Sequence, residues 1–358
     1  MRIDTALNRM QLGWLILSAI LGLDIGGANL KVAHTSGAAR TVAFPLWKHP
    51  DRLADELARL CSAMPAYDSV AITMTGELCD CFPSKCEGVR AILQAVRTAV
   101  PQLRVLAWTN TGVFWDIDFA KDLEDDPLCV AAANWLALAH HVADRFPNEC
   151  VLLIDTGSTT TDIVYLRQGK PEPLGLTDPE RLATGALVYT GVRRTPLCAV
   201  LGMAVAAECF ATMQDAYLCA GLVPEDPADR DTADGRPATL AGARARLARM
   251  RCADSATFSD QEARELADLA LRTQWQAVSR AMERVLDDKP ALDRIVLSGS
   301  GEILGRSVCA RHHAWSTPPI TSLSELLGHA LSEAACAYAV AMLAVRERRR
   351  WLTQIGPS

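Results

Sequence analysis

The sequence predicts an α/β fold built from two similar lobes, and three observations support this. Apolar stretches of strand length alternate with longer stretches of helical periodicity along most of the chain. The 358 residues exceed the usual length of one domain, and half of them are hydrophobic, which is enough apolar material for more than one core. One sequence pattern also occurs twice, about one domain length apart.

The repeated pattern is an apolar strand, an aspartate, a glycine turn and a second apolar strand. Its first copy is ILGLDIGGANLKVAH, around Asp24, and its second copy is VLLIDTGSTTTDIVY, around Asp155. The two aspartates are 131 residues apart. Two copies of one strand–turn–strand unit indicate two lobes of one design, with the two turns in equivalent places.

The remaining elements follow from periodicity and from turn residues. A strand is expected at 16–24. Strands that run into a turn or loop are expected at 69–76, 104–112 and 294–304, and a strand, a turn and a second strand at 150–169. Helices are expected at 87–100, 126–146, 197–222, 238–253, 260–287 and 323–347. The acidic segment 224–239 contains proline and few apolar residues, which favours an exposed loop that either orders around a ligand or is a mobile linker. The expected domains are a leader over 1–15, a first lobe over 16–148, a second, more helical lobe over 149–347 and a tail over 348–358.

The charge and the N-terminus limit the possible partners. The net charge is −6 with acids and bases well mixed, which argues against a nucleic-acid binder because such proteins carry a basic face. An apolar run at 14–23 follows Arg2 and Arg9 and loosely resembles a signal peptide. The run is too short to span a bilayer and leads straight into Asp24, so we expect a buried strand, no membrane partner and a cytoplasmic protein.

Twelve cysteines are scattered along the chain, which is typical of free thiols in a reducing compartment. One cluster, Cys79, Cys81 and Cys86, is a possible metal triplet. Its C-x-C-x4-C spacing is not a familiar zinc pattern, so free thiols are the favoured interpretation.

The aspartate–glycine hairpins favour phosphate chemistry. Glycine at a turn exposes backbone N–H groups that form a nest for phosphate oxygens, and it permits positive φ and close approach. An aspartate at the strand end can hold a divalent cation that bridges to the phosphates. A third element, IVLSGSGEILG, brings Gly299 and Gly301 into a turn that could hold an adenine–ribose or another phosphate, or be an ordinary strand-to-helix turn.

In this order and spacing, LDIGGANLK, IDTGSTTTDIV and IVLSGSGEIL resemble the phosphate-1, phosphate-2 and adenosine segments of the ASKHA superfamily of actin, sugar kinases and Hsp70. The resemblance implies two ribonuclease-H-like lobes with a ligand cleft between them. The Gly- and Thr-rich segments are similar to the hydantoinase/oxoprolinase branch. Four further segments resemble a small group of one-carbon-pathway proteins linked to tetrahydromethanopterin. They are ITMTGELCDCFPSKCEGV, NTGVFW, AAANWLALA and GALVYTGVRRTPL. That group includes the synthases of methanofuran biosynthesis, and the likeness covers about residues 18 to 345.

The resemblance implies a transferase that joins an aminomethyl-furanmethyl diphosphate to the phenol of glutamyl-tyramine, with release of pyrophosphate. Mg²⁺ would then be the cofactor, with Asp24 and Asp155 as metal ligands and Asp162 as a further candidate. The groups expected to hold diphosphate oxygens are Gly26, Gly27, Asn29, Lys31, Gly157, Ser158, Thr159 and Thr160.

The phenol has an ordinary pKa of about 10, so the reaction needs a base. Glu77 is the candidate base and Asp116 or Asp118 the runners-up, although Glu77 also suits a helix N-terminus. Substrate-binding candidates are Lys85, Trp115 and one of Arg193 and Arg194, because a guanidinium suits a carboxylate or phosphate. A solvated lysine and a core tryptophan are the plainer alternatives.

Two other functions remain open from the sequence. An ATP-dependent kinase of a small metabolite would use all three nucleotide-type segments, with ATP as cosubstrate. A non-catalytic, nucleotide-gated scaffold is the third hypothesis, although no peptide-binding module is apparent. Ala-rich helical sequence at 331–345 suits either a core or the seam of a homodimer.

Overall fold

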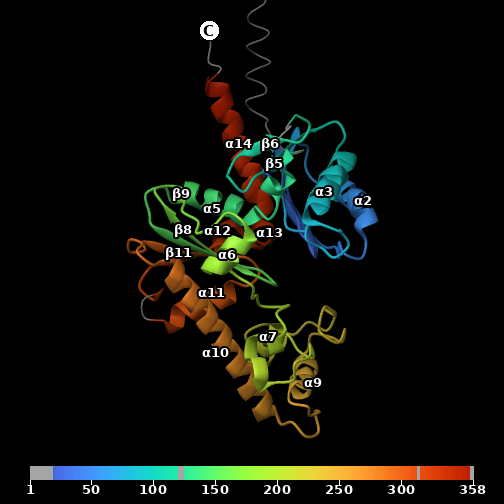
Figure 1. The fold of residues 1–358 in the computed structure, drawn as a ribbon, viewed down its shortest axis with the longest axis vertical. Coiled ribbons are helices and arrows are strands. Elements are labelled where there is room, and N and C mark those ends of the chain that lie inside the picture. The colour runs from blue at the N-terminus through green and yellow to red at the C-terminus, as the bar shows by residue number, and fades with distance from the viewer. Residues whose placement is uncertain (1–18, 120–124, 313–314, 355–358) are drawn as a thin grey trace, which may run out of the picture. The chain divides into compact units, whose positions relative to one another are not determined.

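The computed structural model describes residues 19–119, 125–312 and 315–354 and divides the chain into two compact units (Figure 1). The first unit holds the described residues up to Pro147, Gly169–Pro171 and the chain from Leu327 onward; the second holds Asn148–Gln168 and Glu172–Leu326. The expected leader over 1–15 lies outside the described residues. The expected second lobe extended to residue 347, whereas the structure assigns the chain from Leu327 onward to the first unit.

The described part of the first unit forms one sheet of six strands. Their order is β3 (Ala39–Ala43), β2 (Asn29–His34), β1 (Ile20–Ile25), β4 (Ser69–Met74), β5 (Arg104–Trp108) and β6 (Phe114–Asp116). The strands β1, β4 and β5 are parallel, while β2 pairs antiparallel with β1. All six residues of β1 and of β4 are buried, as expected of central strands covered on both faces.

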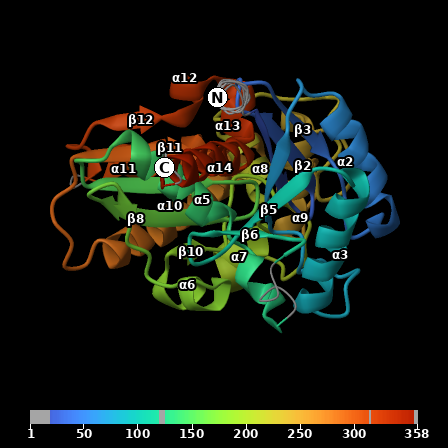
Figure 2. The same ribbon diagram turned by 90° about the horizontal axis from the view of Figure 1, so that it is seen from above.

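Helices cover the sheet of the first unit. The helices α2 (Leu53–Ser62) and α3 (Lys85–Ala99) pack on each other and on Leu21, Leu23 and Ile25 of β1 (Figure 2). Helix α14 (Ala335–Gln354) packs on β1, β4 and α5 (Asn134–Arg145). A Cβ at Gly22 would lie 1.8 Å from the Ala337 carbonyl oxygen, so this glycine permits the close approach of α14. The remaining elements of this unit are η1 (Pro50–Arg52), η2 (Pro127–Val130), β9 (Lys170–Pro171) and α13 (His329–Glu333).

The second unit contains a sheet in the order β10 (Leu187–Val188), β8 (Thr161–Arg167), β7 (Val151–Thr156), β11 (Arg294–Ser298) and β12 (Ile320–Ser322). The arrangement repeats that of the first unit. On one side β7 pairs antiparallel with β8, and on the other side it pairs parallel with β11, which in turn pairs parallel with β12. This shared plan is the one expected of two ribonuclease-H-like lobes, and it confirms the predicted α/β fold class.

Helices form two cores in the second unit. The long helix α10 (Asp260–Val285) and α11 (Glu302–Arg311) pack against the sheet. A second core joins α7 (Leu197–Leu201), α8 (Met213–Cys219) and α9 (Leu240–Met250) to the first half of α10. The short elements are α6 (Asp178–Thr184), η3 (Gly202–Ala204) and α12 (Leu323–Leu327).

Three expected helices are broken in the structure, and backbone geometry gives the reason. Ala132 has a φ of 49° and separates η2 from α5 within the expected helix 126–146. Gly202, with a φ of 56°, follows α7 in the expected helix 197–222, and Gly328, with a φ of 83°, separates α12 from α13. A helix cannot continue through a left-handed residue, so each expected helix becomes two or more short ones.

Among the described helices, none combines the length and the apolar character that a membrane crossing requires.

Candidate functional site: two aspartate–glycine hairpins

The hairpin of the first unit places Asp24 in a buried position near the end of β1. Its residue is 2% exposed, and it lies opposite Lys31 in the β1–β2 register. The Lys31 ammonium contacts Asp24 Oδ2 at 3.2 Å. Asp24 Oδ1 is buried and accepts no hydrogen bond from any described residue. One carboxylate oxygen is therefore neutralised by a lysine, while the other faces a buried site without a donor.

A second orphan oxygen lies on the neighbouring strand. Thr73 of β4 is aligned with Asp24 in the parallel register, and its Oγ1 is also buried without a hydrogen-bond partner among the described residues. Buried polar atoms are normally satisfied, so two such oxygens on adjacent strands indicate a place for a water or a cation. The strand expected at 69–76 includes Thr73, but nothing in the sequence singles out this residue.

The turn after β1 is built for close approach of backbone. Gly26 N–H donates to the Asn29 carbonyl, and a Cβ at Gly26 would lie 2.9 Å from that oxygen. At Gly27, a Cβ would lie 2.7 Å from Cys79 Sγ. Neither glycine has positive φ. The expectation that these glycines supply positive φ is therefore wrong, and their role here is to make room.

The structure brings Glu77 and Lys85 together. Glu77 is 2% exposed, and its Oε1 lies 3.5 Å from Lys85 Nζ. Lys85 is the first residue of α3, whose N-cap Ser84 accepts from the Glu87 N–H. A Cβ at Gly88 would lie 2.1 Å from the Glu77 carbonyl oxygen, so this glycine lets α3 pack directly on Glu77. The base candidate and the anion-binding candidate are thus one ion pair.

The other candidates in the first unit have structural partners. Trp115 packs partly buried against the core of the unit, which supports the plainer alternative for this side chain. Asp116 pairs with Arg104 at 2.7 Å, and Asp118 pairs with Arg97. Glu77 is paired as well, with Lys85, and it differs from these two carboxylates in being buried.

All twelve cysteines are free, and burial is the main reason that the pKa of Cys79 is raised to about 11. A thiol with such a pKa stays protonated near neutral pH. No group of three or more metal-binding side chains occurs within residues 19–119, 125–312 and 315–354.

The hairpin of the second unit has the same register as the first. Asp155 lies opposite Asp162, as Asp24 lies opposite Lys31, and Gly157 N–H donates to the Thr160 carbonyl at 2.8 Å. Asp162 Oδ1 accepts from Nη2 of Arg181, which is 1% exposed. Asp162 is thus held in a buried ion pair, and this geometry argues against its assignment as a metal ligand.

A loop that follows β10 closes on the second turn. Val192 N–H donates to Gly157 O, and the N–H groups of Arg193 and Arg194 donate to Ser158 O at 3.1 and 2.8 Å. A Cβ at Gly191 would lie 2.5 Å from Gly157 O. The two arginines predicted to bind an anion are therefore attached through their backbone to the turn predicted to bind phosphate.

Residues outside the sequence motifs hold this loop. Gln274 of α10, which is 1% exposed, donates through Nε2 to Thr190 Oγ1 and to the Gly191 carbonyl, both at 2.8 Å. Its Oε1 accepts from the Tyr217 hydroxyl at 2.9 Å. Sequence reasoning missed Gln274 because a single glutamine in an amphipathic helix carries no local signal.

The third glycine motif joins the same turn. Gly301 N–H donates to Thr156 O at 2.8 Å, and a Cβ at Gly299 would lie 2.8 Å from Asp155 Oδ1. Gly299 has a φ of 85°, so it is the one glycine of the predicted set that needs the left-handed region. Ser298 Oγ beside it is buried without a hydrogen-bond partner among the described residues.

The predicted magnesium ligands can be tested against these surroundings. Magnesium prefers carboxylate oxygens, and Asp24 offers a buried oxygen that no described residue satisfies. Asp155 provides a second carboxylate at the equivalent place in its own unit. Asp24 and Asp155 therefore suit the ion, whereas Asp162 is already bonded to Arg181.

Comparisons with known proteins identify a family for this chain. Residues 68–349 match the family model of hydantoinase/oxoprolinase. The chain is 31% identical over 335 residues to the (4-{4-[2-(gamma-L-glutamylamino)ethyl]phenoxymethyl}furan-2-yl)methanamine synthase of Methanocaldococcus jannaschii, covering 90% of this chain and 97% of that protein. The synthase of the same name from Methanococcus vannielii is 29% identical over 217 residues, covering 58% of this chain and 96% of that protein.

Among solved structures, component A of the (R)-2-hydroxyglutaryl-CoA dehydratase of Acidaminococcus fermentans has a TM-score of 0.44 and 11% identity, with 93% of this chain and 100% of that chain covered. The sequence matches extend over most of the chain and over nearly the full length of both synthases. The chain belongs to the hydantoinase/oxoprolinase family, and within it to the group that contains these two synthases.

Proposed function

We propose that the protein is a transferase that joins an aminomethyl-furanmethyl diphosphate to the phenol oxygen of glutamyl-tyramine in methanofuran biosynthesis, for one-carbon metabolism. The observation that carries this proposal is the 31% identity to the Methanocaldococcus synthase over 90% of this chain. The product named for that relative contains a phenoxymethyl link between a glutamylaminoethyl-phenyl group and a furan methanamine. Formation of that ether link is the reaction assigned here.

In this reaction one bond forms and one breaks. The phenol oxygen attacks the furanylmethyl carbon, and the bond from that carbon to the diphosphate oxygen breaks with its electron pair, so that pyrophosphate leaves. The phenol proton passes to the Glu77 carboxylate. Lys85, 3.5 Å from Glu77, holds the carboxylate in place and supplies the opposite charge.

The departing group carries the developing charge, and the two hairpins are suited to receive it. The backbone N–H group of Gly27 and the side chains of Ser158 and Thr159 bind diphosphate oxygens. The N–H groups of Gly26 and Gly157 are bonded within their own turns and shape them. Lys31 offsets phosphate charge. Magnesium, when held by the aspartate of a hairpin, Asp24 in the first unit or Asp155 in the second, would neutralise the pyrophosphate.

The test compares three reactions of the full-length protein in the presence of Mg²⁺. With the furanylmethyl diphosphate and glutamyl-tyramine, we expect pyrophosphate release and the aryl ether, identified by mass spectrometry, in equal amounts. With ATP and small alcohols, phosphorylated product would favour a kinase. ATP hydrolysis that requires a protein partner would favour a scaffold, and either outcome without ether formation contradicts the proposal.

A matched pair of variants links the reaction to the hairpin. Asp24→Asn keeps the shape of the side chain but removes the charge that a cation needs, so we expect ether formation to fall at least about 100-fold. Asp51→Asn removes the same charge from an exposed residue and should leave the rate unchanged. Equal rates for the two variants would overturn the role of Asp24.

A further inference from the structure

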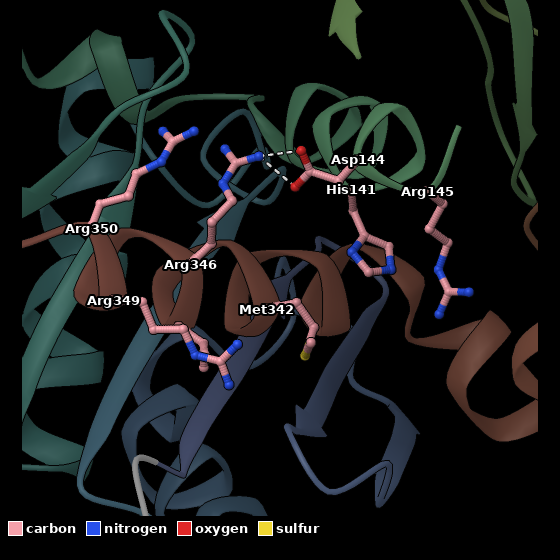
Figure 3. A pocket seen from close by; sticks show the side chains of 8 residues that line it. His141, Asp144, Arg145, Met342, Arg346, Arg349 and Arg350 are labelled. Atoms are coloured by element: carbon pink, nitrogen blue, oxygen red, sulfur yellow. Dashed lines mark hydrogen bonds and ion pairs between the residues drawn. The ribbon is translucent and has the colours of Figure 1, made fainter. Parts of the chain in front are cut away.

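A cavity of about 500 Å³ lies between α5 and α14, within the first unit (Figure 3). Met342 and Val345 of α14 form its apolar part, and His141 of α5 projects toward α14 beside Met342 (Figure 3). This volume is within the range of small-molecule sites. None of the cavity residues belongs to the hairpins or to the Glu77–Lys85 pair.

The cavity is strongly cationic. Its lining includes four arginines and a single carboxylate, and the arginines are Arg145, Arg346, Arg349 and Arg350. Arg346 is bonded to the lone carboxylate, Asp144 (Figure 3). Arg145 and Arg349 pair with no carboxylate within the described ranges. Arg349 and Arg350 of α14 lie three and four residues after Arg346, a spacing at which like charges destabilise a helix. Arg346 pairs with Asp144 and Arg350 with Glu347.

A buried, unsatisfied ring nitrogen adds a second, independent observation. His141 is 7% exposed, and its Nε2 forms no hydrogen bond with any described residue. Burial, with Arg145 and Arg346 beside it, lowers the pKa of His141 to about 4, so the ring is neutral near pH 7. A neutral imidazole can donate or accept one hydrogen bond at this nitrogen, depending on its tautomer. Buried polar atoms are normally satisfied, so this nitrogen lacks the partner that such an atom usually has.

We infer that the α5–α14 cavity binds a small organic anion that carries two or more phosphate or carboxylate groups. The guanidinium groups of Arg145, Arg346 and Arg349 bind the anionic groups, since guanidinium presents paired N–H donors to such oxygens. Met342 and Val345 contact the apolar part of the ligand, and the His141 ring lies beside it. This inference does not depend on the proposed transferase activity, because it uses other residues.

Binding can be measured on the full-length protein by calorimetry, with inorganic tripolyphosphate in one series and citrate in another. These two probes separate a preference for phosphate from a preference for carboxylate. The Lys31→Met variant serves as the background, so that anion binding at the first hairpin is weakened. On this background, Arg349→Ala should weaken binding of the preferred anion about tenfold, since a charge-assisted hydrogen bond contributes on that scale. Arg349→Lys should recover only part of the affinity.

Arg348→Ala is the matched control, because it removes the same charge from the same helix but from a residue that pairs with Asp68 outside the cavity. An equal loss of anion affinity in Arg349→Ala and Arg348→Ala would overturn the inference, and so would the absence of saturable binding of either anion. NMR of the histidine rings gives a second readout. The ring signals of His141, assigned with His141→Gln, should shift when the anion is added, and unchanged signals at saturation would also contradict the site.

Discussion

Arg193 donates through Nη2 to both carboxylate oxygens of Asp229, at 2.6 Å each. Asp231 adds contacts to Arg193 Nε at 3.2 Å and to Arg194 at 3.3 Å. Burial alone would raise the pKa of Asp229, but the Asp231 N–H and the Arg193 guanidinium outweigh it and hold this pKa below its usual value. The acidic segment 224–239 is therefore held by the two arginines that adjoin the turn between β7 and β8.

The first prediction concerns this loop. In Asp229→Asn the side chain loses its charge and one acceptor oxygen, and with that oxygen the bonds that Oδ2 accepts from Arg193 and from Gln214. We expect backbone amides of residues 229–238 to exchange with solvent about tenfold faster, measured by hydrogen–deuterium exchange. Asp268→Asn, an exposed change on α10, should leave this exchange unaltered. A loop that exchanges at the same rate in both variants would show that the ion pair does not order it.

The second prediction separates two glycines of the predicted phosphate site. At Gly157 a Cβ would meet only Thr160 O, at 3.7 Å, and φ is not positive, so Gly157→Ala should change the free energy of unfolding by less than about 1 kcal/mol. The added methyl group stands where a phosphate oxygen approaches the backbone, so pyrophosphate binding in the presence of Mg²⁺ should weaken. Normal pyrophosphate affinity in Gly157→Ala would remove this turn from the proposed site.

Gly299→Ala, unlike Gly157→Ala, should strongly destabilise the protein. Its φ is 85°, and a Cβ would lie 2.2 Å from the Thr156 carbonyl oxygen. We expect a loss of about 2 kcal/mol or more in the free energy of unfolding, measured with urea, because strain and a backbone clash add. A fully stable Gly299→Ala protein would contradict the close packing of this turn on Thr156.

The sequence predicted the hairpins well because their pattern is local. The order of apolar residues, aspartate and glycine fixes a strand, a turn and a second strand, and both turns occur where they were expected. The extent of the helices was predicted less well. Ala132 takes a left-handed conformation that its residue type does not favour, so tertiary packing decides where α5 begins.

In the candidate site too, local features were predicted from the sequence and long-range contacts were not. Residue types such as Asp24 and Glu77 were identified from motifs, but their partners lie far away in sequence or in another element. Asp162 was predicted as a metal ligand because no local pattern indicates its ion pair with Arg181. Lys85 and Glu77 were predicted separately because no local pattern indicates that they form a pair. The orphan oxygen of Thr73 depends on the alignment of β4 beside β1, which only the fold determines.

The third prediction follows from the Asp162–Arg181 pair. Arg181→Met leaves the Asp162 carboxylate without its buried partner, so the free energy of unfolding should fall by about 3 kcal/mol in urea titrations. The double variant Asp162→Leu/Arg181→Met should recover part of this loss, since both charges are then removed. Mg²⁺ affinity in Asp162→Asn should match that of the unaltered protein, and a large loss would restore Asp162 as a metal ligand.

The last prediction concerns pH and two neighbouring histidines of α5. Burial lowers the pKa of both His140 and His141 to about 4, with Arg346 beside both rings, Arg145 beside His141 and Asp144 opposing the shift at His140. His140 faces Trp108, and His141 faces Tyr338. In the unfolded chain both rings have a pKa of about 6.5, so between about pH 6.5 and pH 4 the unfolded state binds more protons. The free energy of unfolding should therefore fall as the pH is lowered through this range, by on the order of 1–3 kcal/mol for each ring.

Urea titrations at several pH values test this slope. Replacing both rings, in His140→Gln/His141→Gln, should flatten the dependence between pH 6.5 and pH 4 even if the variant is less stable at every pH. His49→Gln, at an exposed position, should leave the slope as it is. An unchanged slope in the double variant would mean that the two rings take up protons equally in the folded and unfolded states, and that the neutral His141 of the α5–α14 cavity is wrongly assigned.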